Sequence, residues 1–387
     1  MTARPRDLPP PGARAELLVD LDAVHANVET LRGRVAPAEV MVVVKADGYG
    51  HGMLEVARTA RSAGASWLGV AVLEEALALR ADGDRGRVLC WLSVPGEDYR
   101  AAVEADVDVT AYSVAEVAEV AAAGAAVGRP ARLQLKVDTG LGRGGAGAQD
   151  WPDVVRAAAA AEHAGTVVVS GIWSHFACSD EPEHPANDQQ EQAFLAAVAV
   201  AREAGLAPEV LHLANSAAAL TRPTSRFDLV RCGLAAYGLS PVPQLHTSRD
   251  LGLVPAMTAR ARLAVTKRVP AGSGVSYGHT YVTGRETTLA VVPVGYAEGV
   301  LRSASSVAPV LVAGSTRRVA GRVCMDQFVV DVGDDPVEAG DVAVLFGPGD
   351  GGEPTAEDWA QACGTISYEI VTRIGGRFAR VHTGGAR

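Results

Sequence analysis

Five basic side chains interrupt apolar, valine- and leucine-rich runs in the first 235 residues. A lysine in a low-dielectric pocket loses its proton more readily than a lysine in water, and its amine can then form a Schiff base. One such residue in a strand is usually a satisfied core residue or half of an interior ion pair. Five of them at equivalent positions indicate a shared site that uses amine chemistry. They are Lys45, Lys136, His175, His212 and Arg231.

The runs that carry these residues alternate with alanine-rich helical patterns between about residues 40 and 235. Most of the helical patterns end at a glycine, as helix C-termini commonly do. Apolar strands between amphipathic helices are typical of a parallel sheet covered by helices, and eight such units favour an α/β fold closed as a (β/α)8 TIM barrel. We expect the strands at residues 40–45, 67–71, 88–93, 107–112, 133–138, 167–175, 210–215 and 229–233.

The five basic residues lie at or near the C-terminal ends of these strands, where barrel enzymes keep their active sites. The loops after strands seven and eight commonly bind a phosphate in this fold. Here they contain Ser216, with a hydroxyl donor, and Gly233, where bare backbone amides can approach an anion. A lysine beside a phosphate site indicates either a pyridoxal phosphate enzyme or a Schiff-base aldolase.

The pattern changes after about residue 250 to short valine-rich segments separated by Gly, Pro and Asp turns. This is typical of a β-rich domain, and we expect one helix within it, at residues 354–364. The predicted organisation is a loose N-terminal tail (1–15), a barrel (16–250) and a β-rich C-terminal domain (251–387). A simple aldolase barrel would not need the last of these, so the second domain favours pyridoxal phosphate.

The bulk properties exclude several other classes. The net charge is −10 without a basic block, which argues against nucleic acid or an anionic membrane as the main partner. No apolar run is long enough to span a bilayer, and the N-terminal residues lack the apolar core of a signal peptide. The five cysteines lie far apart without zinc-ligand spacing. We therefore expect a cytoplasmic protein with free thiols and no metal site.

Segments in both parts of the chain resemble, in order, those of the alanine racemase family, which are pyridoxal phosphate enzymes of fold type III. The first is VVVKADGYGHG, and LKVDTGLGR, GIWSHFA, HLANSAA and VRCGLAAYGL follow it in the barrel. The second domain continues with GVSYGHTY, VPVGYAEG, GRVCMDQ and TISYEIVTRI. The resemblance covers about residues 16 to 382. It implies a homodimeric isomerase that interconverts L- and D-alanine and supplies D-alanine for peptidoglycan.

The resemblance also implies two catalytic residues. Lys45 would carry the cofactor, and Tyr277 would be a second acid/base group supplied by the other subunit of the dimer. Racemisation takes a proton from one face of the α-carbon and returns it to the other, so two groups on opposite faces are simpler than one that moves. Each active site would then contain residues of both subunits.

The same resemblance assigns the other site residues. Arg231 would face the pyridine nitrogen, braced by His212, and His175 would lie beside the ring. Lys136 matches a lysine often carbamylated, whose negative charge would hold Arg143. The remaining positions are Tyr49, Ser216, Gly233, Leu234 and Tyr368 around the cofactor phosphate, Arg143 and Met325 at the substrate carboxylate, and Tyr296 and Asp326 along the substrate's access path.

Three alternatives remain open on the sequence. A decarboxylase of basic amino acids has a comparable barrel and β domain, but such enzymes resemble this chain poorly at KVDTGLGR and GVSYG. A racemase of broader specificity would accept serine or larger side chains. A non-catalytic protein that handles the cofactor would consist of the barrel alone, and the second domain with Tyr277 and Met325 argues against it.

Overall fold

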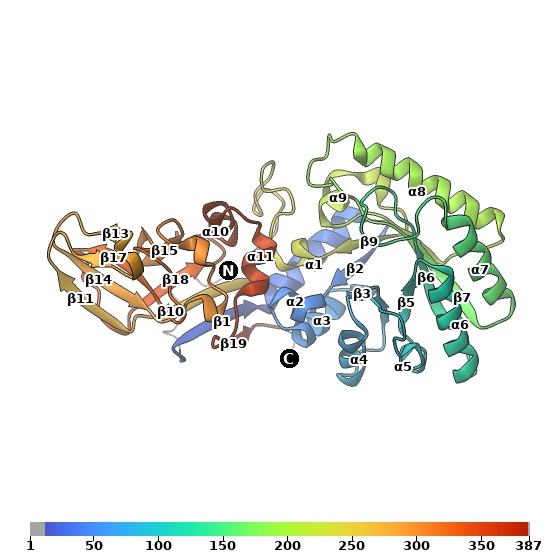
Figure 1. The fold of residues 1–387 in the computed structure, drawn as a ribbon, viewed down its shortest axis with the longest axis horizontal. Helices are drawn as coiled ribbons and strands as arrows, with labels where there is room; N and C mark the ends of the chain where they lie inside the picture. The colour runs from blue at the N-terminus through green and yellow to red at the C-terminus, as the bar shows by residue number, and fades with distance from the viewer. Residues whose placement is uncertain (1–11, 386–387) are drawn as a thin grey trace.

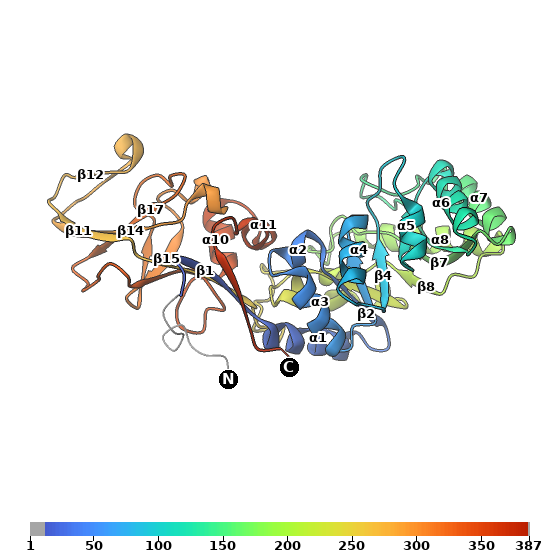
Figure 2. The same cartoon turned by 90° about the horizontal axis from the view of Figure 1, so that it is seen from below.

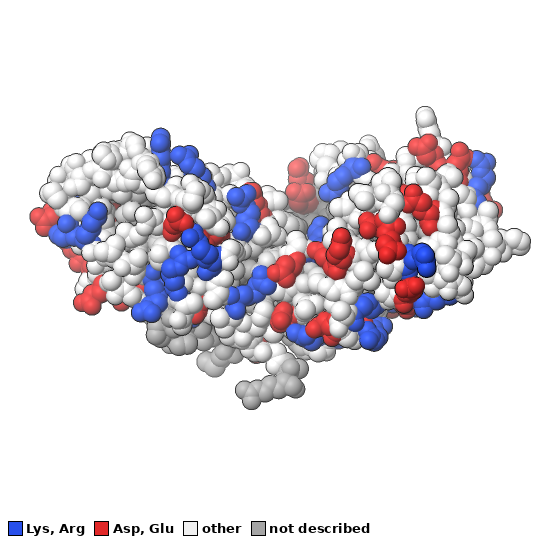
Figure 3. Space-filling model, turned by 60° about the horizontal axis from the view of Figure 1, so that its bottom comes forward, with Lys and Arg blue, Asp and Glu red and all other residues white. Residues whose placement is uncertain are grey.

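The structure, a computed structural model, describes residues 12–385. It has two lobes, a helix-covered barrel and a β-rich lobe, which lie side by side along the longest axis (Figure 1). Most of the expected loose tail, residues 1–11 of 1–15, lies outside the described residues. In the view of Figure 3, acidic and basic side chains are interspersed over both lobes. Within residues 12–385, every helix is too short or too polar to span a bilayer.

The barrel contains the eight parallel strands expected from the sequence, in the order β8-β7-β6-β5-β4-β3-β2-β9. Backbone hydrogen bonds complete the seam between the end strands, since Arg231 N donates to Ala214 O at 3.0 Å and Asp228 N to Leu211 O at 3.1 Å. The predicted fold class is thus confirmed. The strands are β2 (Glu39–Val43), β3 (Trp67–Val70), β4 (Arg87–Cys90), β5 (Asp108–Ala111), β6 (Ala131–Lys136), β7 (Val167–Trp173), β8 (Val210–His212) and β9 (Leu229–Cys232).

Helices connect and cover these strands, and capping residues set their ends. In α6, for example, the Ser113 side chain accepts from Glu116 N at the start, and Gly128 closes the end with a φ of 77°. The helices of the barrel are α1 (Leu21–Val35), α2 (Lys45–Tyr49), α3 (Met53–Ser62), α4 (Leu73–Ala81), α5 (Tyr99–Glu104), α6 (Val114–Val127), α7 (Trp151–His163), α8 (Ala186–Glu203) and α9 (Ser216–Thr221), with 3-10 turns η1 (Pro223–Ser225) and η2 (Leu234–Tyr237).

The β-rich lobe holds a six-stranded sheet, β16-β15-β18-β10-β1-β19, a three-stranded sheet, β11-β14-β17, and the ribbon β12-β13. Its strands and 3-10 turns are β1 (Ala15–Asp20), β10 (Met257–Arg262), β11 (Val265–Val269), β12 (Gly274–Val275), η3 (Tyr277–His279), β13 (Tyr281–Val282), β14 (Thr287–Val292), η4 (Tyr296–Glu298), η5 (Arg302–Ala304), β15 (Pro309–Val312), β16 (Ser315–Arg318), β17 (Phe328–Gly333), β18 (Val342–Phe346) and β19 (Ala379–Thr383).

Two elements of this lobe are absent from the sequence analysis. Strand β1 pairs antiparallel with β10 and parallel with β19, so the predicted barrel range of 16–250 begins with a strand of the other lobe's sheet. The expected helix is present as α10 (Ala356–Cys363), but a second one, α11 (Ser367–Arg373), follows it. Strand β1 is short, and its partners are more than 200 residues away, which no local pattern reveals.

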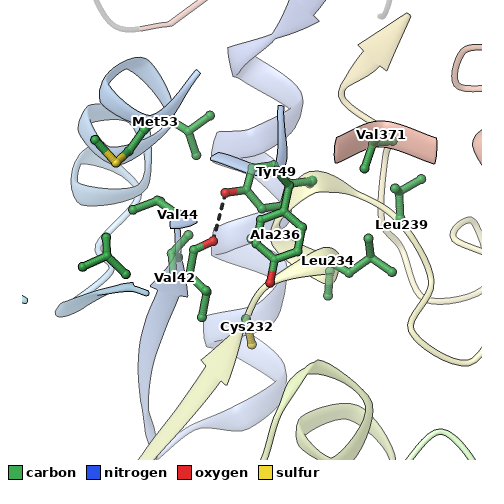
Figure 4. Close-up of a cluster of buried hydrophobic side chains, with 14 of the residues drawn as sticks. Val42, Val44, Tyr49, Met53, Cys232, Leu234, Ala236, Leu239 and Val371 are labelled. Carbon is green, nitrogen blue, oxygen red and sulfur yellow. Dashed lines mark hydrogen bonds between the residues drawn. The ribbon is translucent and has the colours of Figure 1, made fainter. Parts of the chain in front are cut away.

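A buried cluster lies where α11 packs against the end of β2, α2 and η2 (Figure 4). Val42 and Val44 from the β2 segment, Tyr49 from α2 and Leu234 from η2 pack with Val371 of α11. Apolar burial of this kind is the main force that holds packed elements in place. Helix α11 is thereby fixed against the barrel rim, and it presents its Tyr368 to the cavity described next.

Candidate active site

A cavity of about 700 Å³ opens at the C-terminal ends of the barrel strands. It gathers ten of the residues that the sequence singled out, from six segments of the chain. Aromatic side chains that the sequence analysis did not name, among them Trp91, Tyr112 and Trp173, complete its wall. The ten residues are Lys45, Tyr49, Lys136, Arg143, His175, Ser216, Arg231, Gly233, Leu234 and Tyr368.

Lys45 stands at the start of a left-handed turn. Ala46, Asp47 and Tyr49 have φ angles of 53°, 52° and 53°, a conformation that costs non-glycine residues about 1–2 kcal/mol each. The Glu75 carboxylate holds the turn by accepting from Ala46 N at 2.7 Å. Such strain persists only where the surroundings fix it, and it is common at functional sites. The turn therefore places the lysine amine at a defined point on the rim.

The environment of Lys45 lowers the pKa of its amine. Burial lowers the pKa of the amine, and the positive charge of Arg143 lowers it further, while Glu75 opposes both. The amine lies 5.8 Å from the centre of the Trp91 ring. A lysine with a lowered pKa is a better nucleophile and base near neutral pH.

An anion cradle lies beside Lys45, between β9 and α9. Gly233 N donates to Ser216 Oγ at 2.9 Å. A Cβ at position 233 would lie 2.3 Å from Tyr49 Oη, so no side chain fits there. Burial raises the pKa of Tyr368 to about 12 and also raises that of Tyr49, so both phenols keep their protons and can donate. Hydroxyl groups and bare backbone amides are the donor set that a phosphate group needs.

Arg231 is buried without a carboxylate partner in the described part of the chain. Its Nη1 donates to His212 Nδ1 at 3.0 Å and its Nη2 to His175 Nδ1 at 3.0 Å. Carbonyl oxygens of Ser174, His212 and Leu213 accept the other bonds of these two nitrogens. Burial lowers the pKa of Arg231 to about 9, which leaves the guanidinium charged at neutral pH.

The two imidazoles beside Arg231 are neutral. Burial is the largest cause that lowers the pKa of His175 and of His212 well below the usual value, and the Arg231 charge adds to it. The His212 ring stacks on Trp173 with an interplanar angle of 6° and centroids 5.6 Å apart. Within residues 12–385, Arg231 Nε–H has no hydrogen-bond acceptor, so this donor remains for a group in the cavity.

Lys136 lies in a strongly basic part of the cavity. Its amine is 4.4 Å from the centre of the Trp173 ring. Burial lowers its pKa to about 8, with further contributions from Arg231 and Arg143. Among the residues described, no carboxylate forms an ion pair with Lys136. The loop that carries Arg143 is held by Asp138, whose Oδ1 accepts from three backbone amides, those of residues 140–142.

The structure does not bring the predicted residues of the β-rich lobe to this cavity. Tyr277 is 71% exposed and lies in η3 beside the ribbon β12-β13, which projects from the end of the lobe (Figure 2). Met325 and Tyr296 are 54% and 41% exposed. Asp326 forms an ion pair with Arg377 at 2.5 Å. None of the four lines the cavity of its own chain.

Models of a single protein family match nearly the whole chain. "Alanine racemase, N-terminal domain" matches residues 19–241, and "Alanine racemase, C-terminal domain" matches residues 256–382. The alanine racemase of Salinispora arenicola is 58% identical over 362 residues, which cover 94% of this chain and 96% of the relative. The chain belongs to the alanine racemase family. Its predicted family and its predicted class, a pyridoxal-phosphate-dependent isomerase, are confirmed.

Solved structures agree with this assignment. Alanine racemase from D-cycloserine-producing Streptomyces lavendulae has a TM-score of 0.96 at 58% identity, covering 97% of this chain and 98% of that one. Alanine racemase from Bartonella henselae, with covalently bound pyridoxal phosphate, has a TM-score of 0.85 at 28% identity, covering 96% and 100%. The cradle at Gly233, the unused donor of Arg231 and the Lys45 amine fit that cofactor by their chemistry.

Some cavity residues could have been found from the sequence and others could not. Trp173 is the last residue of β7 and lies two residues before His175, so the period-two alternation expected for strand residues 167–175 places both on the inner face. Glu75 gives no such signal, because it comes from a different unit of the barrel and acts on a backbone amide. In the described part of the chain, no three His, Cys, Asp or Glu side chains are arranged to hold a metal ion.

Proposed function

We propose that this protein interconverts L- and D-alanine with pyridoxal phosphate as cofactor, using Lys45 of one copy and Tyr277 of a second copy as the two bases. One observation carries the proposal. The barrel cavity contains a basic amine, an anion cradle and an arginine with a free donor, while the other proposed base stands exposed on a projecting ribbon.

The cavity residues have separate tasks in this proposal. The Lys45 amine would bind the cofactor covalently. Ser216 and the phenols of Tyr49 and Tyr368 would bind its phosphate, and the Gly233 amide would join them by exchanging its bond to Ser216 Oγ for one to the phosphate. When bound, the cofactor supplies an electron sink for the charge left at the α-carbon after proton loss.

Arg231 would limit side reactions. Its Nε–H would donate to the pyridine nitrogen without giving up the proton, since a guanidinium with a pKa of about 9 stays charged near neutral pH. A pyridine ring whose nitrogen is unprotonated is a weaker electron sink than one whose nitrogen is protonated by a neighbouring carboxylic acid. The proton would then return quickly to the α-carbon, and racemisation would be favoured over transamination.

The substrate carboxylate needs a positive group near the cofactor, and Arg143 is the candidate in the cavity. Met325 of the second copy would complete this subsite, with Tyr296 and Asp326 along the access path. Lys136, carbamylated by carbon dioxide, would give Arg143 a negatively charged neighbour, and no carboxylate in the described part of the chain forms an ion pair with Arg143. Converting an amine with a lowered pKa into an anion would also relieve the repulsion among Lys136, Arg143 and Arg231.

A homodimer follows from the need for a base on each face of the substrate. Aromatic and apolar side chains of the β-rich lobe are exposed in the single chain, and such patches often mark an interface. A two-fold arrangement gives two equivalent sites. The exposed residues are Tyr277, Tyr296, Met325 and Ile366.

The first experiment tests chemistry and assembly together. The purified protein with pyridoxal phosphate should absorb near 420 nm, become trapped at Lys45 by borohydride, and interconvert pure L- and D-alanine. Mixing Lys45→Ala chains with Tyr277→Ala chains should restore activity in one of the two sites of each heterodimer. Protein that stays colourless, or that leaves optically pure alanine unchanged, would contradict the proposal. Release of carbon dioxide from ornithine, lysine or diaminopimelate would point instead to a decarboxylase.

The proposed cellular role is supply of D-alanine for peptidoglycan in the cytoplasm. It is supported by the bacterial sources of the relatives named above and by the free state of all five cysteines. Expression of the chain should rescue a bacterial strain that lacks its own racemase and requires D-alanine. Rescue by Lys45→Ala would contradict this role. Equal turnover of serine would show a broader specificity.

A further inference from the structure

A chain of buried polar side chains crosses the barrel beneath Arg231. It begins at Asp108 on β5 and passes through Gln134 on β6 to His212 on β8, which contacts Arg231. Gln134 Nε2 donates to Asp108 Oδ2 at 3.2 Å, and Gln134 Oε1 lies 2.7 Å from His212 Nε2. His212 Nδ1 accepts from Arg231 Nη1 at 3.0 Å. All four side chains are buried, so the orientation of each one restricts the orientation of the next.

Asp108 sets the direction of these hydrogen bonds because its carboxylate can only accept. Arg132 Nε donates to Oδ1 at 2.8 Å, and Ser170 Oγ donates to Oδ2 at 2.5 Å. Arg132 in turn pairs with Glu209 at 2.7 Å. Gln134 must therefore turn its amide NH2 toward Asp108. Its carbonyl oxygen is then the atom that faces His212.

This orientation fixes the proton of His212. A carbonyl oxygen 2.7 Å from Nε2 requires a proton on that nitrogen, and a neutral imidazole carries only one. Nδ1 is then bare and can accept from Arg231. If the Gln134 amide were reversed, both imidazole nitrogens would face donors and one contact would be lost.

The strand beside Gln134 leaves space for this arrangement. A Cβ on Gly171 of β7 would lie 2.8 Å from Gln134 Cδ and 2.9 Å from its Oε1. The register of β6 against β7 also shifts between Leu133 and Gln134, so Gln134 pairs with Gly171. The amide is thus confined by the backbone of the neighbouring strand as well as by its hydrogen bonds.

We propose that Gln134, oriented by Asp108, is a positioning residue that holds Arg231 by fixing the tautomer of His212. The five acceptors of Nη1 and Nη2 then stay in place, and Nε–H remains the donor that points to the cavity ligand. Hydrogen bonds in such buried chains strengthen one another. The effect on the reaction rests on the proposed function, whereas the tautomer is a property of this chain alone.

The first test measures that tautomer by nitrogen-15 NMR of the full-length protein with labelled histidine. His212 is assigned by the signal that disappears in His212→Asn. We expect a protonated Nε2 and an unprotonated Nδ1. In Gln134→Leu the Nε2–H has lost its acceptor, so its signal should move and its proton should exchange faster with water. A wild-type His212 that carries its proton on Nδ1 would overturn the inference, whatever the variants do.

The second test separates positioning from stability. Gln134→Leu should raise the ratio of transamination to racemisation about tenfold, the size expected when one buried hydrogen bond is left unmade, while KM for alanine stays within about twofold. The control is Thr110→Val. Thr110 is buried on β5, the strand that carries Asp108, and its hydroxyl has no hydrogen-bond partner among the described residues. This substitution should change neither the His212 signal nor the ratio.

Gly171→Ala covers the case in which Gln134→Leu does not fold, because it moves the same amide without removing a polar atom. It should shift the His212 signal and the ratio in the same direction as Gln134→Leu. A loss of racemisation in either variant with an unchanged ratio and an unchanged His212 signal would overturn the inference. A wild-type protein that does not act on alanine would defeat the proposed function. The measurement of the His212 tautomer would still decide the inference about Gln134.

Discussion

The barrel rim and the ribbon β12-β13 hold their functional side chains in opposite ways. On the rim, Arg231 and its histidines are buried, and their hydrogen bonds determine their orientation and charge. On the ribbon, Tyr277 is 71% exposed, beside a two-stranded hairpin that pairs with no other strand among residues 12–385. A site on a rigid, packed scaffold is preorganised within one chain. The ribbon itself is anchored on the β-rich lobe through Val275 and Tyr281, but the Tyr277 side chain that it carries remains mostly exposed.

This difference separates the part of the molecule proposed to bind the cofactor from the part proposed to act only in a dimer. Within one chain, the barrel rim and Tyr368 of α11 carry the groups proposed to hold the cofactor and one face of the substrate. In the proposed function, the opposite face depends on a second copy of the chain. Substitutions on the rim should therefore alter cofactor binding and reaction type. Substitutions on the ribbon should leave the cofactor in place and remove only one direction of proton transfer.

Removal of the rim amine should have the largest effect. In Lys45→Ala we expect no covalent cofactor and a fall in racemisation of at least about 10⁴-fold, because the residue serves both as the attachment point and as a base. Absorbance near 420 nm and alanine turnover measure the two roles. His25→Ala, at an exposed ion pair on α1, is the control and should match the wild type. Retention of the 420 nm band in Lys45→Ala would contradict the assignment.

Removal of the ribbon phenol should come next. In Tyr277→Ala the 420 nm band should persist, while α-hydrogen exchange falls by about 10²–10⁴-fold from one alanine enantiomer and far less from the other. Tyr281→Phe is the matched control, since Tyr281 Oη lies on the same ribbon and donates to Asp331 at 2.7 Å. Equal losses from both enantiomers would show that Tyr277 is not one of two bases.

The same contrast explains what could be predicted from the sequence. The barrel is built of local units, each with a strand, a turn and a helix in sequence order, so periodicity alone located all eight strands. The charged residues at their ends then fell on one rim. Strand β1 could not be predicted in this way, because its partners β10 and β19 are distant in the chain. A helix as short as α11 leaves little periodic signal.

The finer parts of the site depend on contacts that sequence does not encode locally. Gln134 reads as an ordinary strand residue, and its position between Asp108 and His212 becomes visible only when three strands are placed side by side. The position of Tyr277 relative to Lys45 lies beyond a single chain altogether. Resemblance to a family supplied that pairing, and it stays a prediction here.

Reversing the charge at Arg231 tests the chemistry of the rim. In Arg231→Glu, a carboxyl group can give a proton to the pyridine nitrogen and strengthen the electron sink. We expect transamination to rise relative to racemisation by about tenfold or more, with racemisation itself reduced by about 10²-fold. Half-reactions with L-alanine, followed by the release of pyruvate, measure the ratio. Arg226→Glu, on the loop before β9, controls for charge near the barrel. An unchanged ratio in Arg231→Glu would defeat the proposed role.

The smallest effect should come from Lys136, whose pKa of about 8 makes its carbamylation depend on pH. Only the neutral amine reacts with carbon dioxide, so the carbamylated fraction should rise as pH rises through 8 at fixed dissolved carbon dioxide. Added bicarbonate should lower KM for alanine by about two- to tenfold near pH 7 and have less effect near pH 9. Lys267, exposed on β11, offers a matched control as Lys267→Ala, which should keep the bicarbonate response. Lys136→Ala should lose it, and a response that survives in this variant would place the effect of carbon dioxide elsewhere.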